Sequence, residues 1–246
     1  MGILTDHIEI TRRMCPVIFL LDDSGSMDGA PIGAVNSAIE NVLPILSSMN
    51  QGNPDAEIKF AALAFSYGAD WLTGTELVSP EDYVWRNSLN ADGPTSMGAA
   101  FQELNRKLSV KDGFMKRASG SVAPVLFLLS DGAPTDDYKS GLRQLEANSW
   151  YKVAVRVAIG YSEDCNDDVL REFTGNPETV LHTDNPNDLK KLIQFVTITS
   201  SMVASKGKSA IAGRTATPDD NTQKLADEMA ALGGDINAPM DPEDEF

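Results

Sequence analysis

Two continuous apolar runs stand out along the chain, and each ends in an acidic residue. They are CPVIFLLD at 15–22 and APVLFLLSD at 123–131. A short, unbroken apolar run is typical of a strand that is buried on both faces of a sheet. Shorter or more mixed runs predict four further strands, at 57–66, 71–77, 152–160 and 179–183.

Between these strands, apolar residues recur every three or four positions, which predicts amphipathic helices. The first helix begins near Ile32, and Pro44 within it predicts a kink or an early helix end. A loop at 93–96 leads into a second helix, whose apolar face runs from Met97 to Leu108. A third helix spans Tyr138 to Leu145, and a last one covers about 187–203.

Strands that alternate with helices place the chain in the α/β class. We expect a doubly wound, mostly parallel six-stranded sheet with helices on both faces. Ligands of such sheets bind at the carboxyl ends of the strands. Asp22 and Asp131 both lie at that edge, and so does the 93–96 loop if its helix packs normally. Three segments that are far apart in the sequence therefore converge.

The side chains that converge all carry oxygen, and none carries nitrogen or sulfur. We call them the oxygen cluster: Asp22, Ser24, Ser26, Thr95 and Asp131. Oxygen ligands select hard cations, so Mg²⁺ is expected, with Mn²⁺ or Ca²⁺ as alternatives. Two carboxylates balance a divalent charge and leave the metal able to accept one more anionic oxygen. The competing interpretation is local: Ser24 and Ser26 as helix caps and Thr95 as a turn residue.

Composition narrows the range of partners. The 246 residues carry a net charge of −16, which argues against a nucleic-acid or anionic-membrane surface. No apolar run is long enough to cross a bilayer, and the first residues show no secretory signal, so we expect a cytoplasmic protein. Residues 213–246 hold nine acids against two basic residues. We therefore expect a folded domain at 10–205 and an acidic, mobile tail at 206–246.

Within that tail, Leu225, Met229, Leu232 and Ile236 form a short apolar stripe. Gly233 and Gly234 predict that any helix ends after Leu232. Such a short helix is marginal in water by itself. It is expected to become ordered, if at all, on a partner or on a neighbouring surface of its own domain.

Three motifs carry a resemblance to von Willebrand factor type A (VWA) domains. DDSGS resembles the D-x-S-x-S of that family's metal-ion-dependent adhesion site (MIDAS), GPTS its threonine loop, and LLSDGAPTD its second aspartate loop. The resemblance covers about 13–205 and implies a Rossmann-like VWA fold. It also implies metal ligation by the hydroxyls of Ser24, Ser26 and Thr95, with Asp22 and Asp131 acting directly or through water. Pro94 departs from the family, which often has a second glycine there.

The compact form looks most like bacterial TerY-type proteins of tellurite-resistance and stress systems. That resemblance implies a non-catalytic adapter that works with a protein kinase and a metal-dependent phosphatase. Its partner would supply an Asp or Glu to the metal.

Two other classes of protein remain open on the sequence. A phosphohydrolase of the haloacid dehalogenase type would use Asp22 as nucleophile, but Ser24 stands where its second acid, the proton donor, belongs. A cell-surface adhesin would be expected to carry a leader and disulfides, and neither is visible. We therefore expect that the protein is not an enzyme.

Overall fold

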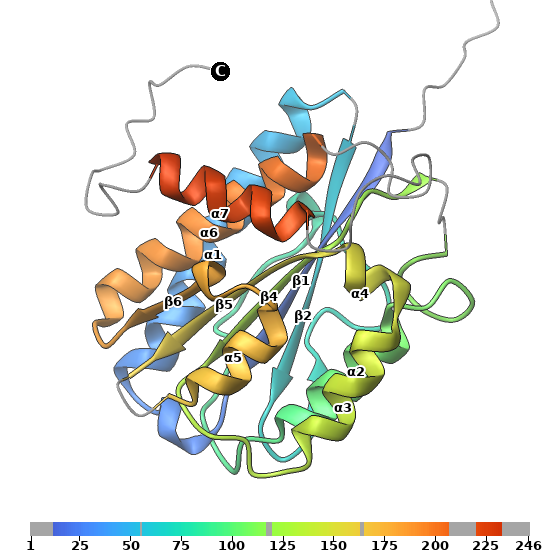
Figure 1. The fold of residues 1–246 in the computed structure, drawn as a ribbon. Coiled ribbons are helices and arrows are strands. Elements are labelled where there is room, and N and C mark those ends of the chain that lie inside the picture. Colours follow the sequence, from blue (N-terminus) through green and yellow to red (C-terminus); the bar gives the residue numbers. More distant parts are fainter. Residues whose placement is uncertain (1–11, 55, 117–119, 163–164, 207–219, 233–246) are drawn as a thin grey trace, which may run out of the picture.

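Six strands form one sheet in the order β3-β2-β1-β4-β5-β6 (Figure 1). Neighbouring strands are parallel except for β2 and β3, which are antiparallel. This confirms the predicted mostly parallel, six-stranded α/β architecture. The computed structural model describes residues 12–54, 56–116, 120–162, 165–206 and 220–232. The strands are β1 (Arg13–Asp22), β2 (Ala56–Phe65), β3 (Ala69–Trp71), β4 (Val125–Ser130), β5 (Val155–Tyr161) and β6 (Val180–Thr183).

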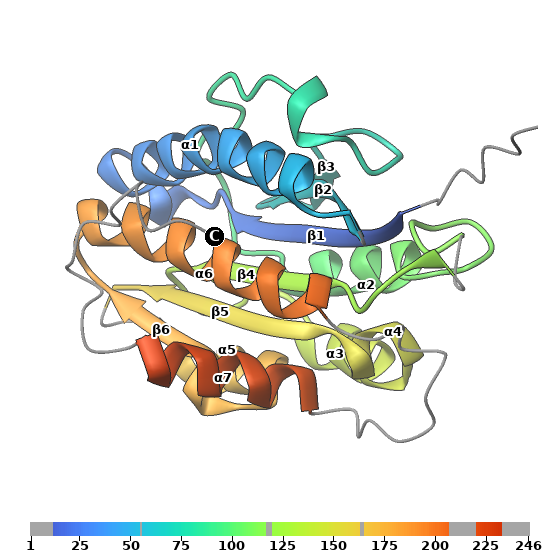
Figure 2. The same ribbon diagram turned by 90° about the horizontal axis from the view of Figure 1, so that it is seen from above.

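Helices cover both faces of the sheet (Figures 1 and 2). The core on one face includes side chains of α1, α6 and α7, and the core on the other face includes those of α2 to α5. The helices are α1 (Ala30–Gly52), α2 (Met97–Lys107), α3 (Tyr138–Ala147), α4 (Ser149–Val153), α5 (Asp167–Thr174), α6 (Pro186–Lys206) and α7 (Asp220–Leu232).

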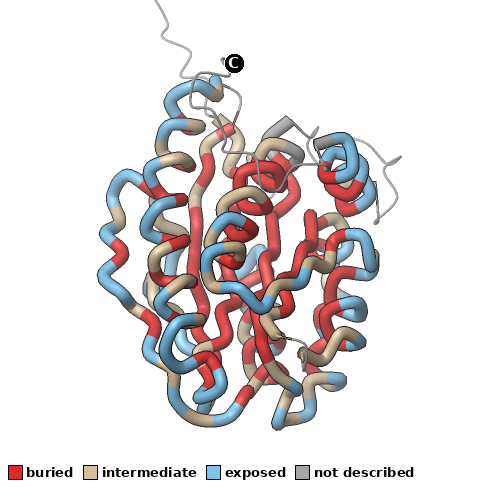
Figure 3. The backbone as a smooth tube through the Cα atoms, turned by 90° about the vertical axis from the view of Figure 1, so that its left-hand side faces the viewer, coloured by how far each residue is buried: buried red, intermediate tan, exposed pale blue. Residues whose placement is uncertain are grey.

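The central strand β1 shows why its sequence is apolar throughout. Val17, Phe19 and Leu21 belong to the core under α1 and α6, whereas Ile18 and Leu20 belong to the core under α2 and α3. All five side chains are fully buried. Figure 3 shows the same result for the sheet as a whole, since buried backbone concentrates in the strands between the helices. Burial on both faces removes the usual alternation of polar and apolar residues.

The strand predicted at 71–77 is wrong in its position. The strand that forms is β3, which ends at Trp71. The chain turns directly afterwards: Gly74 has a φ of 83°, and its N–H donates to the carbonyl of Trp71 at 3.2 Å. Glycine adopts this left-handed conformation without steric cost, so the turn is built into the sequence.

Pro44 does not end α1, which continues to Gly52, so the predicted early end is wrong. Proline removes the N–H that would bond the carbonyl of Glu40. Glu40 and Pro44 are both exposed, so water can bond that carbonyl instead. Leu43 and Leu46 on the opposite side are buried in the core, which holds the helix together across the missing bond.

The helices α4 and α5 are not among those predicted. For α5 a signal exists in the sequence, because Val169, Leu170 and Phe173 have helical spacing and are buried. Gly175 ends the helix with a φ of 69°, the left-handed conformation of a glycine C-cap. The pattern is only eight residues long, which is short for detection by periodicity.

The C-terminal segment 206–246 contains α7 in its described part. The described helix reaches Leu232, and Gly233 and Gly234 lie outside the described residues, so the helix end at this glycine pair stays a prediction. Leu225 is fully buried in the core with α6. Oγ1 of Thr222 also donates to the carbonyl of Ala154 at 3.2 Å. Thus α7 lies on its own domain, one of the two expected destinations. Residues 207–219 and 233–246 lie outside the described residues, so the boundary at 206 and the mobility of the tail stay predictions.

Candidate metal centre

The three predicted segments meet at the carboxyl edge of the sheet. Leu21 of β1 pairs with Leu129 of β4, so Asp22 comes to lie beside the end of β4. The N–H of Gly25 donates to the carbonyl of Gly93 at 2.9 Å. This bond joins the turn after β1 to residues 93–96, which we call the threonine loop.

Asp22 is fully buried, and both of its oxygens accept hydrogen bonds. Oδ1 accepts from the N–H of Ser24 at 2.9 Å, and Oδ2 accepts from Oγ of Ser130 at 2.5 Å. Burial raises the pKa of Asp22 to about 6, although the bonds from Ser130 and Ser24 oppose the rise. The carboxylate is therefore held in place but poorly solvated, which a bound cation would relieve.

A chain of hydrogen bonds links the serines to the second carboxylate. Oγ of Ser24 lies 3.1 Å from Oγ of Ser26, and Oγ of Ser26 donates to Oδ1 of Asp131 at 2.7 Å. Burial raises the pKa of Asp131, and the bond from Ser26 acts in the opposite direction. Ser24 and Asp131 are buried while Ser26 is exposed, so the cluster opens to solvent on the Ser26 side.

The side chain of Thr95 lies close to Ser26 and to the residue after Asp131. A methyl group placed on Gly132 would lie 3.7 Å from Oγ1 of Thr95 and 3.9 Å from Oγ of Ser26. Thr95 is only 5% exposed, and Gly132 directly follows Asp131. The structure therefore brings all five residues of the predicted oxygen cluster together.

The local interpretation of the two serines fails. Ser24 precedes a three-residue 3₁₀ helix (Gly25–Met27) but makes no side-chain cap hydrogen bond. Ser26 lies within that helix, and its hydroxyl bonds Asp131 instead. The residue that caps α1 is Gly29. Neither serine hydroxyl therefore caps a helix. Instead, the hydroxyl of Ser24 contacts that of Ser26, which binds the carboxylate of Asp131.

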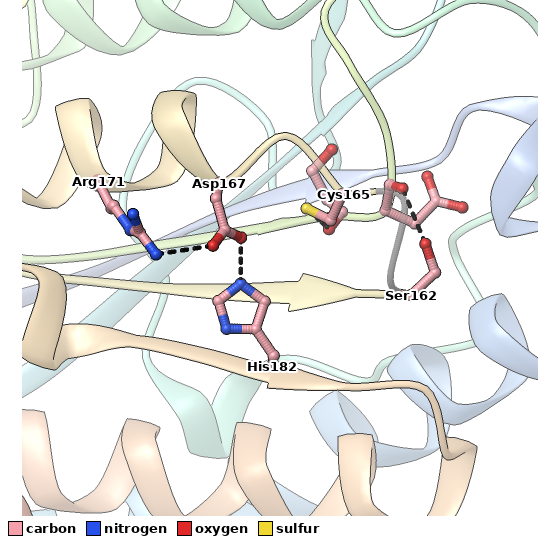
Figure 4. A network of polar contacts seen from close by, with 7 residues as sticks. Ser162, Cys165, Asp167, Arg171 and His182 are labelled. Atoms are coloured by element: carbon pink, nitrogen blue, oxygen red, sulfur yellow. Dashed lines mark hydrogen bonds and ion pairs between the residues drawn. The ribbon is translucent and has the colours of Figure 1, made fainter.

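A second group of polar residues, which includes Ser162 and Cys165 (Figure 4), contacts the end of β4 and was not predicted. Oγ of Ser162 donates to the carbonyl of Asp131 at 3.4 Å, and Sγ of Cys165 donates to the carbonyl of Ser130 at 3.4 Å. These bonds hold the end of β4 against the segment that follows β5. They join residues about 30 positions apart, so no local sequence pattern signals them.

Neither Cys165 nor His182 is arranged for nucleophilic catalysis. Burial raises the pKa of Cys165 to about 12, so the group is a neutral thiol near pH 7. Nε2 of His182 lies 2.5 Å from Oδ1 of Asp167, whose Oδ2 also accepts from Arg171 at 2.9 Å (Figure 4). His182 is therefore held by Asp167.

The donor set fits a hard divalent cation. Three hydroxyls and two carboxylates lie together, and the raised pKa values of Asp22 and Asp131 reflect buried carboxylates without compensating positive charge. Among the described residues, no three of His, Cys, Asp and Glu form a metal-type group. A metal at this edge would thus depend on the hydroxyls of Ser24, Ser26 and Thr95 as well as on the acids. Such an all-oxygen set favours Mg²⁺, Mn²⁺ or Ca²⁺.

In the part of the chain that the structure describes, no helix is both long and apolar enough to span a membrane. The expectation of a cytoplasmic protein stays a prediction.

Solved structures share the fold at low sequence identity. A von Willebrand factor type A protein from Catenulispora acidiphila is 21% identical, with a TM-score of 0.55, over 78% of this chain and 43% of that one. Proximal thread matrix protein 1 of the mussel byssus, in a form with a zinc-occupied MIDAS motif, is 18% identical, with a TM-score of 0.56, over 76% of this chain and 48% of that one. The chain thus spans less than half the length of these two relatives.

The von Willebrand factor domain of the pilus tip protein Mfa5 from Porphyromonas gingivalis is 9% identical, with a TM-score of 0.62, over 81% of this chain and 98% of that one. At these identities the likeness shows the fold alone. No curated protein matched the sequence. The family model of the von Willebrand factor type A domain matches residues 17–195, which is well over half of the chain. On this evidence the chain belongs to the von Willebrand factor type A domain family.

Proposed function

We propose that the oxygen cluster binds a divalent cation, Mg²⁺ in the first place. Ser24, Ser26 and Thr95 would ligate it through hydroxyls, and Asp22 and Asp131 would do so directly or through water. The observation that carries the proposal is the convergence of five oxygen side chains from three separate segments. Since Mg²⁺ prefers six ligands and keeps water where protein ligands are missing, the exposed Ser26 side is open to a further ligand.

That further ligand is an Asp or Glu of a partner protein. The surface around the site is negative, because the acids Asp28 and Asp92 are both exposed there. An acidic partner is repelled by this surround unless the cation is present. Binding is therefore metal-dependent, and the metal supplies the attraction.

Tyr67 supports a protein partner at this edge. Its side chain is 74% exposed, and Cε2 lies 2.5 Å from where a Cβ on Gly93 would be. The ring thus lies on the threonine loop, next to the cluster. Exposed aromatic rings near the centre of an interface contribute strongly to protein binding.

The finer role is a cytoplasmic, TerY-like adapter, acting with a protein kinase and a metal-dependent phosphatase in a bacterial stress or tellurite-resistance system. Its support is the order and form of the DDSGS, GPTS and SDGAPTDD motifs. The adapter is non-catalytic, which agrees with the neutral Cys165 thiol and with the pairing of His182 to Asp167.

No observation favours the phosphohydrolase. Ser24 stands where the second acid belongs, and a serine hydroxyl is too weak an acid to replace a carboxylic acid as proton donor.

The test is a titration of the metal-free protein with Mg²⁺, Mn²⁺ and Ca²⁺ by isothermal calorimetry. Wild type is expected to bind one ion, while Asp22→Ala and Ser24→Ala lose most of the affinity. Ser48→Ala, an exposed serine on α1, is the matched control and should bind as wild type does. Equal affinity in wild type and in both cluster variants would refute the metal site. Capture of a partner should then require Mg²⁺ and fail with chelator or with Ser24→Ala.

A further inference from the structure

The first turn of α2 receives a carboxylate from a distant segment. Oδ1 of Asp136 accepts from the N–H of Gly98 at 2.8 Å, and Oδ2 accepts from the N–H of Ala99 at 2.9 Å. The residue that normally caps this helix, Ser96, makes no side-chain cap bond. Free N–H groups at a helix start favour a negative charge, so Asp136 substitutes for the missing cap.

A third hydrogen bond, between two backbone groups, ties the same two segments together. The N–H of Thr135 donates to the carbonyl of Thr95 at 2.9 Å. Thr135 and Asp136 belong to the stretch 131–137, which also contains Asp131 and which we call the aspartate segment. The three bonds therefore join the backbone that carries one candidate ligand, Thr95, to the backbone that carries another, Asp131.

Close packing leaves no space between these segments. A Cβ on Gly98 would lie 2.8 Å from the carbonyl oxygen of Asp137, and a Cβ on Gly141 would lie 2.7 Å from the carbonyl oxygen of Gly98. Both distances are shorter than real side chains allow. Only glycine lets α2 approach the aspartate segment and α3 so closely, and this approach brings Asp136 within reach of the α2 amides.

Two other bonds anchor the far side of the threonine loop. Gly93 accepts from the N–H of Gly25, and the N–H of Ser96 donates to the carbonyl of Ser66 at 3.1 Å. The loop is thus held from the β1 side and the β2 side by backbone bonds. On the β4 side, the side chain of Asp136 adds to the backbone bond at Thr135.

We propose that Asp136 is a positioning residue that holds Thr95 at the metal together with Asp131. It does not touch the ion, and it acts by fixing the threonine loop on the aspartate segment before the ion arrives. This inference rests on the proposed metal site. A ligand that is already in place needs no ordering when the ion binds, so affinity is higher than with a loose loop.

The test compares Asp136→Ala with Asp137→Ala in the full chain. Asp137 is the matched control, because its side chain caps α3 by accepting from the N–H of Ser140 at 3.2 Å. Both changes remove one acid and one helix cap. Asp136→Ala is expected to weaken Mg²⁺ binding on the order of tenfold, whereas Asp137→Ala should change it less than about twofold. Asp136→Asn, which keeps one acceptor oxygen, should fall between wild type and Asp136→Ala. Equal losses in the two alanine variants would overturn the proposal, because they would indicate a general effect of charge.

A double substitution separates positioning from stability. In a Thr95→Ala background, Asp136→Ala should cause no further loss of Mg²⁺ affinity, while it still lowers the melting temperature. The same fold loss in both backgrounds would show that Asp136 does not act through Thr95, and would overturn the proposal.

Amide hydrogen exchange tests the connection without any metal. Asp136→Ala should speed exchange at Gly98, Ala99 and Thr135, and Asp137→Ala should leave these three amides unchanged. If wild type bound no Mg²⁺, the proposed function would fail, and the exchange result would still decide whether Asp136 holds the loop. Unchanged exchange at Thr135 in Asp136→Ala would overturn the positioning role.

Discussion

Oγ of Ser130 donates a hydrogen bond of 2.5 Å to Oδ2 of Asp22, across 108 positions of sequence. The bond connects the end of β4 to the end of β1. It orients a fully buried carboxylate whose pKa burial raises to about 6. The carboxylate of Asp22 is thus held in a buried position where its negative charge is unfavourable by itself and would be stabilised by a bound cation. The next three predictions follow from this state.

Asp22→Asn should separate metal binding from folding. The amide has the same shape and no charge to desolvate, so the free energy of unfolding without metal should equal or exceed that of wild type. Wild type should gain about 2.7 kcal/mol at a Mg²⁺ concentration of roughly 100 times Kd, and the variant should gain nothing. Thermal unfolding with Mg²⁺ and with chelator measures both quantities. Asp28→Asn removes an exposed acid from the same loop and should keep the full gain.

The affinity for Mg²⁺ should decrease as the pH is lowered through the range in which Asp22 takes up a proton. The ion binds the charged carboxylate, so protons compete with it below a pH of about 6. The apparent affinity should fall about tenfold for each pH unit below that value. Calorimetry at pH 5, 6, 7 and 8 provides the test. A flat profile from pH 5 to 8 would show that Asp22 does not titrate in this range.

The free energy of unfolding of the metal-free protein should depend on pH in the opposite direction to the Mg²⁺ affinity. The pKa of Asp22 is about 6 in the folded protein against an ordinary value of 3.8. Between these values the folded state holds a proton that the unfolded state has lost. Asp22 therefore makes the free energy of unfolding decrease as the pH rises through this window, by on the order of 2 kcal/mol. Urea unfolding with chelator at pH 4.5 and 7 measures the change, and Asp22→Asn should reduce it.

Gly141→Ala should destabilise the fold. Its Cβ would lie 2.7 Å from the carbonyl oxygen of Gly98 and 3.0 Å from Cβ of Phe101, so α2 and α3 must separate. The expected loss in the free energy of unfolding is about 1–3 kcal/mol. Gly33→Ala in α1 is the control, because nothing lies within 4 Å of its Cβ position. That change should stabilise the protein by about 0.5–1 kcal/mol in urea unfolding. Similar effects of the two substitutions would contradict the tight contact of α2 and α3.

Leu225→Ala should show whether α7 unfolds together with the rest of the domain. Leu225 is fully buried in the core with α6, so truncation should cost about 2–5 kcal/mol. Lys224→Ala, at the exposed neighbouring position, should change stability by less than about 0.5 kcal/mol. A Leu225→Ala variant as stable as wild type would show that α7 does not contribute to the folded core, and would favour a tail that begins at 206.

Local patterns determined the main elements of the fold. The apolar run of β1 requires burial on both faces, and residues as close as Val17 and Ile18 do pack on opposite sides. The early helix end expected at Pro44 was wrong, because an exposed proline in a well-packed helix loses only one hydrogen bond. It also misplaced β3, where a single turn at Gly74 outweighs the strand preference of the residues around it.

The residues of the oxygen cluster could also be predicted from the sequence by itself. Asp22 and Asp131 end predicted strands, Ser24 and Ser26 follow the first of these strands, and Thr95 lies in a loop that leads into a predicted helix. Parallel strands bring their carboxyl ends to one edge, which is where ligands bind. Chemistry then follows from residue type, since hydroxyls and carboxylates favour hard cations. The sequence could therefore indicate which groups meet and which kind of ion suits them.

Only the tertiary structure decided how these groups are held. Ser130 orients Asp22, and Asp136 binds the amides of Gly98 and Ala99 across 38 and 37 positions. The hydrogen bonds depend on distances of about 3 Å, and such distances exist only after α2 and the aspartate segment have packed. Sequence spacing carries no information on that packing. The residues that hold the cluster therefore emerge from the fold, whereas the residues that compose it are visible in the chain.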